Sequence, residues 1–208
     1  PAISDLASGK YLVSQLRAID IDDLLGRSTA PADPELFRQM LADRTILVTG
    51  AGGSIGSELT RLIAKWHPKK LVLLEANEFA LYEIERTLKL TNGTVVVPVL
   101  GSVADAALVR RTLTAEGVEV IFHTAAHKHV PLVESNALEG VRNNVIGTRV
   151  LVEAARDAGV ARFVLISTDK AVRPSSVMGA TKRWAELIVR HYGEEVDAAK
   201  QRFCAVRF

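Results

Sequence analysis

A hydroxyl, a carboxyl group and an amine are adjacent at Thr168, Asp169 and Lys170, and a second amine, Lys182, follows in a segment of helical spacing. Such groups transfer protons when their surroundings shift their pKa values toward neutral pH. We expect Asp169 to act as an acid if burial raises its pKa. We expect Lys170 to act as a base if burial and the nearby Lys182 lower its pKa. A solvated ion pair is the simpler alternative for Asp169 and Lys170.

Met178 precedes Lys182 by one helical turn, so both side chains share one face of the predicted helix. A methionine has no ionisable proton, and by itself Met178 is most simply a packing residue. For proton transfer at this face, Lys182 or a water molecule that it polarises is one candidate; the alternative is that Thr168 helps by orienting a reacting hydroxyl.

Glycines recur at every third position from Gly50 through Gly53 to Gly56, after the apolar run at residues 45–48. Between a strand and a helix, this spacing permits a tight turn, a close approach to a pyrophosphate and close packing of the helix on the strand. The free N–H groups at the start of that helix favour phosphate binding. The sequence therefore predicts a dinucleotide site formed by Gly50, Gly52, Gly53, Ser54, Ile55 and Gly56.

Glu75 ends the second apolar run, which begins at Lys70. A carboxylate at this position accepts both hydroxyls of an adenosine ribose and repels a 2′-phosphate, so we expect NAD rather than NADP. The simpler alternative is a solvated acid at the end of a strand.

Short apolar runs alternate with segments of helical spacing from residue 45 onward, which is typical of an α/β fold with a doubly wound parallel sheet. We divide the chain into an N-terminal helical connector at 1–44 and a NAD-binding Rossmann domain at 45–208. The strands are expected at 45–48, 70–74, 94–100, 118–123, 162–166 and 201–208. The helices are expected at 11–19, 34–42, 57–66, 79–90, 106–115, 133–157 and 178–191.

Composition excludes several classes of protein. A net charge of +2 and an aromatic content of 5% argue against nucleic-acid binding, and the single cysteine excludes an internal disulfide. No apolar run reaches the length of a membrane span. His123, His127 and His129 lack the cysteine or acidic partners of a metal site, so we expect no metal. The chain starts without Met and ends in an apolar run, which favours a piece of a longer protein.

Four segments resemble the extended short-chain dehydrogenase/reductases, and in particular the nucleoside-diphosphate-sugar 4,6-dehydratases of bacterial polysaccharide biosynthesis. They are Thr49–Glu58, His127–Pro131, Asn144–Thr148 and Ser167–Lys182. Met178 stands where most short-chain dehydrogenases have tyrosine, which indicates the large, membrane-anchored branch. The acidic segment at 19–27 resembles the connector that follows the membrane region in that branch.

The resemblance implies an NAD-dependent lyase that converts UDP-N-acetylglucosamine, or a close relative, to a 4-keto-6-deoxy sugar. It further implies a truncated C-terminal substrate part and a cytoplasmic domain of an inner-membrane protein. Ser102 stands where relatives often carry an adenine-binding aspartate, and its hydroxyl can still form a hydrogen bond there. The resemblance adds Ser102, Val103, Ala125, Ala126, Asn144 and Lys182 as cofactor-binding residues. It adds Lys128, His129 and Met178 as substrate-binding residues.

Two other functions remain open at this point. A nucleotide-sugar 4-epimerase shares the first oxidation but needs no acid–base pair for C5 and C6, so the Thr168-Asp169-Lys170 run favours the dehydratase. A non-catalytic nucleotide-sensing module is favoured only by Met178. Exposed apolar surface near Phe203 and Phe208 predicts self-association into a homo-oligomer.

Overall fold

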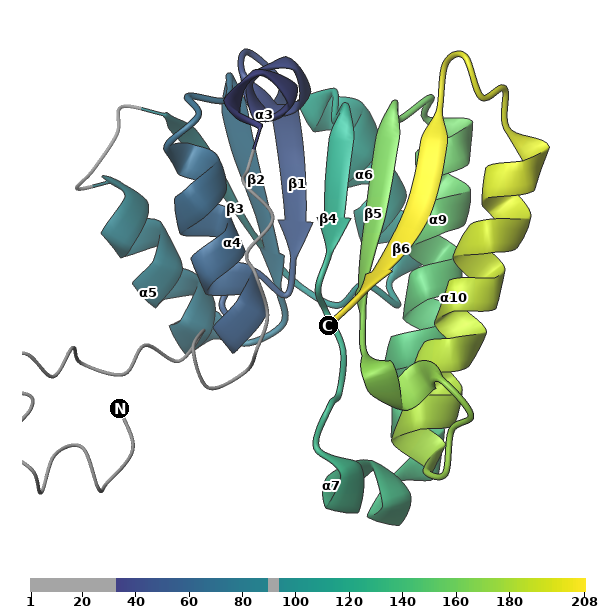
Figure 1. The fold of residues 1–208 in the computed structure, drawn as a ribbon. Coiled ribbons are helices and arrows are strands. Elements are labelled where there is room, and N and C mark those ends of the chain that lie inside the picture. The colour runs from purple at the N-terminus through teal and green to yellow at the C-terminus, as the bar shows by residue number, and fades with distance from the viewer. Residues whose placement is uncertain (1–32, 90–93) are drawn as a thin grey trace, which may run out of the picture. The chain divides into compact units, whose positions relative to one another are not determined.

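A parallel six-stranded sheet with the order β3-β2-β1-β4-β5-β6 forms the centre of the fold (Figure 1). This computed structural model describes residues 33–89 and 94–208. The sheet order is that of a dinucleotide-binding Rossmann fold, which confirms the predicted fold class. The strands are β1 (Thr45–Thr49), β2 (Lys70–Glu75), β3 (Val95–Leu100), β4 (Val120–His123), β5 (Arg162–Ser167) and β6 (Arg202–Arg207).

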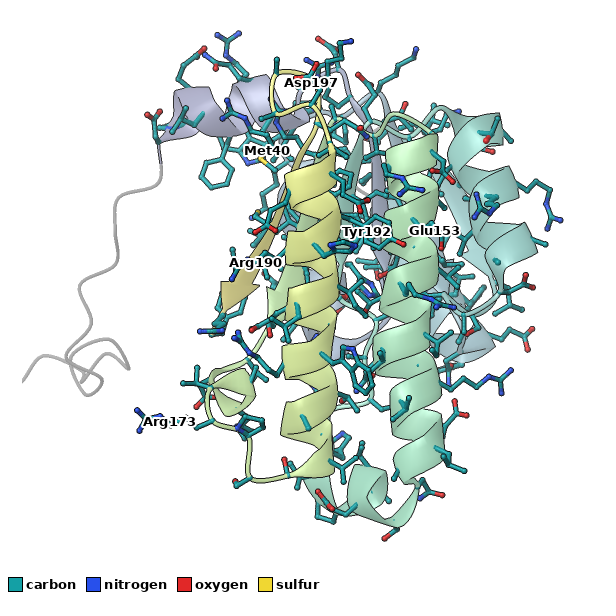
Figure 2. The ribbon with its side chains drawn as sticks, turned by 90° about the vertical axis from the view of Figure 1, so that its right-hand side faces the viewer. Met40, Glu153, Arg173, Arg190, Tyr192 and Asp197 are labelled. Atoms are coloured by element: carbon teal, nitrogen blue, oxygen red, sulfur yellow. The ribbon has the colours of Figure 1, made fainter. Side chains whose placement is uncertain are left out.

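Helices cover both faces of the sheet, with α4 (Ser54–Ala64) and α5 (Glu78–Lys89) on one side and α6 (Ala106–Glu116), α9 (Gly147–Asp157) and α10 (Val177–Glu195) on the other (Figure 1). The helices α9 and α10 lie side by side (Figure 2). The Arg156 guanidinium of α9 lies 5.0 Å from the centre of the Tyr192 ring of α10. These helices are the crossovers that parallel strands require.

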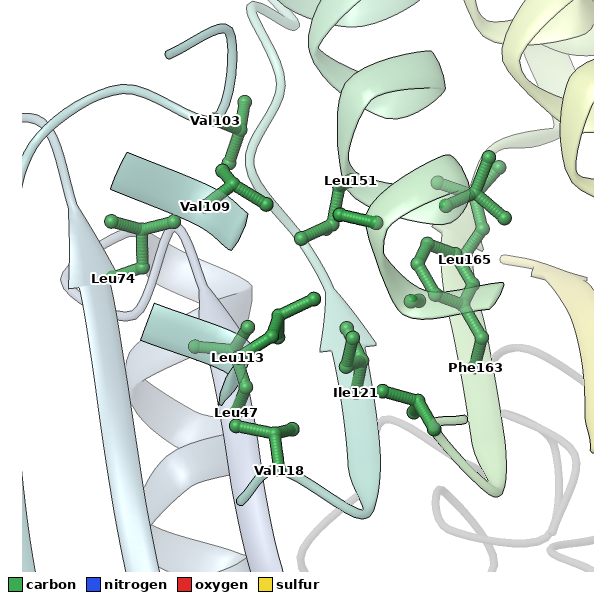
Figure 3. Packing of buried hydrophobic residues seen from close by; sticks show 14 of the residues in the cluster. Leu47, Leu74, Val103, Val109, Leu113, Val118, Ile121, Leu151, Phe163 and Leu165 are labelled. Carbon is green, nitrogen blue, oxygen red and sulfur yellow. The ribbon is translucent and has the colours of Figure 1, made fainter. Parts of the chain in front are cut away.

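Successive strand residues point to opposite faces of the sheet and so build separate cores. Leu47, Ile121 and Phe163 pack under α6, α9 and α10 (Figure 3). Their neighbours Ile46 and Val120 belong to the core on the other face, under α4 and α5. Burial on both faces explains why the strands read as continuous apolar runs rather than as alternating patterns.

The expected continuous helix from 133 to 157 is wrong. The structure instead has α7 (Val130–Ser135), α8 (Ala137–Val141), one turn of π-helix, η2 (Arg142–Ile146), and then α9. Asn136 breaks the run, because its backbone has φ −135° and ψ 52° and its side-chain amide donates to the carbonyl oxygen of Leu132. Gly159 follows α9 with φ +72°, a conformation that glycine adopts without strain.

The N-terminal part of the chain is described only from residue 33. The helix expected at 34–42 is present as α3 (Pro34–Leu41), whereas the helix expected at 11–19 lies outside the described residues. The domain boundary between residues 44 and 45 stays a prediction. All six strands run parallel, so their carboxyl ends meet at one edge, which also carries the glycine loop and the start of α10.

Candidate cofactor and active site

The glycine loop connects β1 to α4 at the carboxyl edge of the sheet. Gly50 has φ +64°, and its N–H donates to the carbonyl oxygen of Leu74 at 2.7 Å. A Cβ atom on Gly56 would overlap the carbonyl oxygen of Gly50 and lie 2.7 Å from Oγ1 of Thr124. The loop therefore requires glycine at 50 for its turn and at 56 for the close packing of α4, as the spacing predicts.

The start of α4 offers N–H groups to an anion. The N–H of Ser57 donates to the carbonyl oxygen of Gly53, so the N–H groups of Ser54 and Ile55 precede the first hydrogen bond of the helix. Both residues are exposed. Among the residues that the structure describes, only the carbonyl oxygen of Gly50 would lie within 4 Å of a Cβ atom on Gly53, at 3.2 Å, which leaves space above the loop. This geometry fits a pyrophosphate.

Glu75 closes one side of a pocket beside the loop. Its Oε2 accepts a hydrogen bond from the N–H of Gly52 at 3.0 Å, and its Oε1 accepts one from the N–H of Asn77 at 3.0 Å. Each oxygen keeps a further lone pair for a ribose hydroxyl. Ser102 also lines this pocket, and its Oγ accepts from the N–H of Ala104, which leaves its hydroxyl proton available to a ligand. The expected cofactor residues on this pocket are Gly50, Gly53, Glu75, Ser102, Val103, Ala125 and Ala126.

A neighbouring pocket gathers most of the residues expected to perform chemistry. Ala126 and Thr124 line both pockets, so the two are contiguous along the carboxyl edge of the sheet. Met178 is buried in its wall, as a packing residue would be. The expected residues that line this second pocket are Ile55, Ala126, Lys128, Thr168, Lys170, Met178 and Lys182.

Lys182 is the buried amine of this second pocket, with 6% of its surface exposed. Its Nζ donates to the carbonyl oxygen of Ile166 at 2.7 Å. Burial lowers the pKa of Lys182 from 10.5 to about 8, although the Glu186 carboxylate partly opposes this shift. A substantial fraction of the amine is therefore neutral at mildly alkaline pH, as a group that exchanges protons requires.

Asp169 does not line the pocket, so the burial that was expected to raise its pKa is absent. Its side chain is 73% exposed, and its Oδ1 accepts a hydrogen bond from the Thr168 hydroxyl at 2.9 Å. That hydrogen bond and the Lys170 ammonium, 3.5 Å away, lower the pKa of Asp169. The expected burial of Lys170 is also absent, since 58% of its side chain is exposed.

Asn144 holds the loop that carries the expected substrate residues. Its Oδ1 accepts from the N–H of His127 at 2.8 Å, and its Nδ2 donates to the carbonyl oxygen of His127 and to Oγ1 of Thr181. Asn143 donates to the same Oδ1, so the amide of Asn144 has no hydrogen-bonding capacity left for a cofactor. Asn144 is buried and positions the loop by these contacts.

Lys128 and His129 follow in that loop. Lys128 Nζ lies 3.4 Å from Oγ of Ser54, which brings it to the start of α4. His129 precedes α7 and lines an adjoining pocket with His127 and Glu139. The His127 Nε2 and a Glu139 oxygen lie 3.5 Å apart.

Sequence reasoning missed two residues of this edge. Thr124 lines both pockets, and its hydroxyl donates to the carbonyl oxygen of Thr49 at 2.6 Å. Asn143 lines the cofactor pocket from η2. The sequence could have indicated Thr124 as a pocket residue, because it directly follows a buried strand. No sequence pattern indicates Asn143, because the π-helical turn brings it to the pocket.

Within residues 33–89 and 94–208, no cluster of histidine, cysteine and acidic side chains has the arrangement that binds a metal ion. None of the helices in that part of the chain combines the length and apolar content needed to cross a bilayer.

The chain is similar in sequence to proteins of polysaccharide biosynthesis. The chain is 44% identical over its full length to the capsular polysaccharide biosynthesis protein CapD of Staphylococcus aureus, of which it spans 35%. It is 28% identical to an inverting UDP-N-acetylglucosamine 4,6-dehydratase of Campylobacter jejuni, over 81% of this chain and 49% of that protein.

A solved structure is also similar to this chain. The crystal structure of DesIV, a dTDP-glucose 4,6-dehydratase from Streptomyces venezuelae with NAD bound, superposes with a TM-score of 0.64 at 29% identity. The superposition covers 72% of this chain and 52% of DesIV. Residues 46–208 match the family described as "Polysaccharide biosynthesis protein". The chain therefore belongs to the polysaccharide biosynthesis protein family.

Proposed function

We propose that this chain is the cofactor-binding part of an NAD-dependent nucleoside-diphosphate-sugar 4,6-dehydratase. The observation that carries the proposal is the contact between the two pockets. One contains the glycine loop and Glu75, and the other contains Thr168, Lys170 and Lys182. A dinucleotide that lies along this edge would bring its nicotinamide end beside these three side chains.

The residues of the first pocket fit NAD. The N–H groups of Ser54 and Ile55 would hold the pyrophosphate, and the carboxylate of Glu75 would accept the adenosine ribose hydroxyls. A 2′-phosphate would meet that carboxylate, which favours NAD over NADP. When bound, NAD would supply the hydride chemistry of the reaction, which is removal of hydride from C4 of the sugar and its delivery to C6.

Lys182 and Thr168 would act on the 4-hydroxyl group of the sugar. Met178 carries no proton, so the tyrosine role of related enzymes passes to other groups. We assign the proton of the 4-hydroxyl to Lys182, directly or through one water molecule, because its lowered pKa allows the neutral amine to accept it. The Thr168 hydroxyl, on the wall of the same pocket, would orient the reacting oxygen.

Asp169 and Lys170 would perform the elimination as a coupled pair. Transfer of one proton from the Lys170 ammonium to the Asp169 carboxylate, 3.5 Å away, creates the neutral base and the acid that the step needs. A substrate that covers the pair excludes water, and a less polar environment favours the neutral forms. Lys170 then removes the C5 proton, and Asp169 protonates the 6-hydroxyl, which leaves as water. The step restores the ion pair.

The resemblance further supports UDP-N-acetylglucosamine or a close relative as the substrate, with Lys128, His129 and Met178 on the sugar side. It supports membrane anchoring of the whole protein on the cytoplasmic side of an inner membrane. We also propose a homo-oligomer. Of the aromatic residues that favoured self-association, Phe208 is 70% exposed, whereas Phe203 is partly buried against Phe163.

The test incubates UDP-N-acetylglucosamine and NAD with the chain and with a longer form extended to the length of its relatives. Mass spectrometry of the nucleotide sugar reports the reaction. The proposal predicts a product lighter by one water molecule, at least with the longer form. An unchanged mass with NAD bound would instead favour an epimerase or a nucleotide-sensing module.

A further inference from the structure

A cavity of about 560 Å³ lies at the amino ends of the strands, opposite the cofactor edge. We call it the arginine cavity, because Arg44, Arg162 and Arg202 line it together with Glu119. Met40 of α3 borders it, and this helix lies at the same end of the molecule as Asp197, which precedes β6 (Figure 2). A strand of five residues is about 17 Å long, so the cavity lies about that far from the glycine loop at the opposite edge of the sheet.

Arg162 and Arg202 bring like charges together in this cavity. They are register partners at the start of β5 and β6, so their side chains emerge side by side on one face of the sheet. Like charges directly opposite each other on adjacent strands are destabilising. Among the residues that the structure describes, no carboxylate oxygen lies within 4.0 Å of either guanidinium. Their side-chain hydrogen bonds go to the carbonyl oxygens of Ala161 and Ala198.

Glu119 is the acidic group of the cavity, and its charge is already engaged. Its Oε1 lies 2.7 Å from Nη1 of Arg44, and its Oε2 accepts from the N–H of Thr45 at 3.0 Å. Partial burial raises the pKa of Glu119, but these contacts and the charge of Lys69 outweigh it and keep the pKa low. Arg44 is thus neutralised, and the charges of Arg162 and Arg202 remain.

We propose that the arginine cavity binds the phosphate group of a small anion, held between Arg162 and Arg202. Planar guanidinium groups donate paired N–H bonds that match phosphate oxygens. Within residues 33–89 and 94–208, Arg162 and Arg202 each keep N–H groups that donate to no protein acceptor. A bound dianion would replace the repulsion across the β5–β6 ladder with attraction to both strands. Leu36 and Met40 offer apolar surface to an organic group attached to the phosphate. The ligand is therefore either a free anion such as pyrophosphate or a phosphate ester.

Isothermal titration calorimetry with inorganic pyrophosphate, at saturating NAD to occupy the glycine loop, tests this site. Arg162→Gln and Arg202→Gln should each weaken pyrophosphate binding at least tenfold. Arg190→Gln is the matched control, because Arg190 is exposed and pairs with Glu194. Arg162→Lys and Arg202→Lys keep the charge but remove the paired donors, and we expect intermediate affinities from them. Binding that is absent in the original chain, or equal in all these variants, would overturn the proposal.

A second titration with UDP separates the two sources of the phosphate. Tighter binding of UDP than of pyrophosphate, lost in Arg202→Gln, would identify a phosphate ester, and equal or weaker binding would identify a free anion. Melting temperature gives an independent readout. Without an anion, Arg202→Gln should melt no lower than the original chain, because a repulsion is removed. With pyrophosphate, the original chain should gain more than this variant, and equal gains would contradict the site.

Discussion

The imidazole Nε2 of His123 lies 3.0 Å from Oγ1 of Thr148, and both side chains are almost fully buried. The Thr148 hydroxyl donates to the carbonyl oxygen of Asn144 at 2.6 Å, so Thr148 must accept the Nε2 proton of His123. The opposite nitrogen, Nδ1, then accepts from the Thr49 hydroxyl at 2.7 Å. Thr49 Oγ1 in turn accepts the N–H of Ala125 at 3.3 Å.

This chain of hydrogen bonds joins the end of β1, the end of β4 and the π-helical turn below the cofactor pocket. In this arrangement the imidazole is neutral, and a proton on Nδ1 would force the Thr49 hydroxyl to turn its own proton away. Burial, followed by the charge of Lys182, lowers the pKa of His123 from 6.5 to about 3. A histidine that first suggests a metal ligand is thus a structural bridge between buried hydroxyl groups.

The buried neutral state of His123 predicts a pH dependence of stability. Between pH 6.5 and about 3 the unfolded chain binds a proton on this histidine that the folded chain does not bind. The free energy of unfolding should therefore fall as the pH falls from 6.5 toward 5, with a slope that approaches about 1.4 kcal/mol per pH unit at the lower end. Urea denaturation across this range measures it.

His123→Gln keeps groups that can bond both threonines but does not titrate. It should lose this part of the slope, whereas His191→Gln, which removes an exposed histidine, should retain it. Equal slopes in the original chain and His123→Gln would show that His123 is not buried in the neutral form.

A side chain at position 56 should weaken NAD binding by the glycine loop. Gly56→Ala would force a Cβ atom against the carbonyl oxygen of Gly50 and so move the start of α4. We expect NAD to bind at least about tenfold more weakly, a loss of about 1.4 kcal/mol. Calorimetric titration with NAD measures this change.

Gly117→Ala is the matched control. Gly117 has φ +65°, and within the described part of the chain a Cβ atom there would meet no heavy atom within 4 Å. Alanine at this position should therefore cost about 1 kcal/mol of stability through its backbone alone. It should leave NAD affinity unchanged. Equal NAD affinities in Gly56→Ala and the original chain would contradict the assignment of the loop.

Lys182→Met should lose activity without losing stability. The pKa of about 8 lies below the usual 10.5, so near pH 7 burial of the ammonium costs about 3 kcal/mol. Its removal offsets the lost bond to Ile166, and the variant should unfold at equal or higher urea concentration. The original chain should gain stability between pH 8 and 10.5, where the unfolded state binds more protons, and Lys182→Met should not.

Lys200→Met, at an 82% exposed side chain, is the control for Lys182→Met and should change neither quantity. A destabilised Lys182→Met variant with intact turnover would show that this lysine serves the fold rather than the reaction.

Asp169→Asn should separate binding from chemistry. The side chain is 73% exposed, so stability should change by less than about 0.5 kcal/mol and NAD affinity by less than about twofold. Dehydration by the longer form should fall about a hundredfold or more, because an amide cannot donate the proton to the departing hydroxyl. Asp197→Asn removes another exposed carboxylate and should leave the rate unchanged. An active Asp169→Asn enzyme would remove Asp169 from the mechanism.

The sequence predicted the sheet well for a physical reason. Parallel strands buried on both faces read as apolar runs such as 45–48 and 70–74, and their carboxyl ends must meet at one edge. That rule alone brings Gly50, Glu75 and Thr168 together, although they are far apart in the chain.

The rest of the site depends on contacts between distant elements. At the break beside Asn136 and in the π-helical turn before α9, the side-chain amides of Asn136 and Asn144 donate to backbone carbonyl groups, and helical periodicity does not indicate these contacts. The exposure of Asp169 could not be predicted from the sequence either, because local sequence does not determine how far the end of a strand projects. The partnership of His123 with Thr148 joins β4 to α9, and no spacing in the chain indicates it.

Dehydration is tested most directly by proton NMR of UDP-N-acetylglucosamine in deuterated water, with NAD and the longer form of the protein. A 4,6-dehydratase should give a new methyl signal from C6 and loss of the C5 proton signal as deuterium enters from solvent. Inversion at C4 without deuterium, or an unchanged sugar, would contradict the dehydratase assignment.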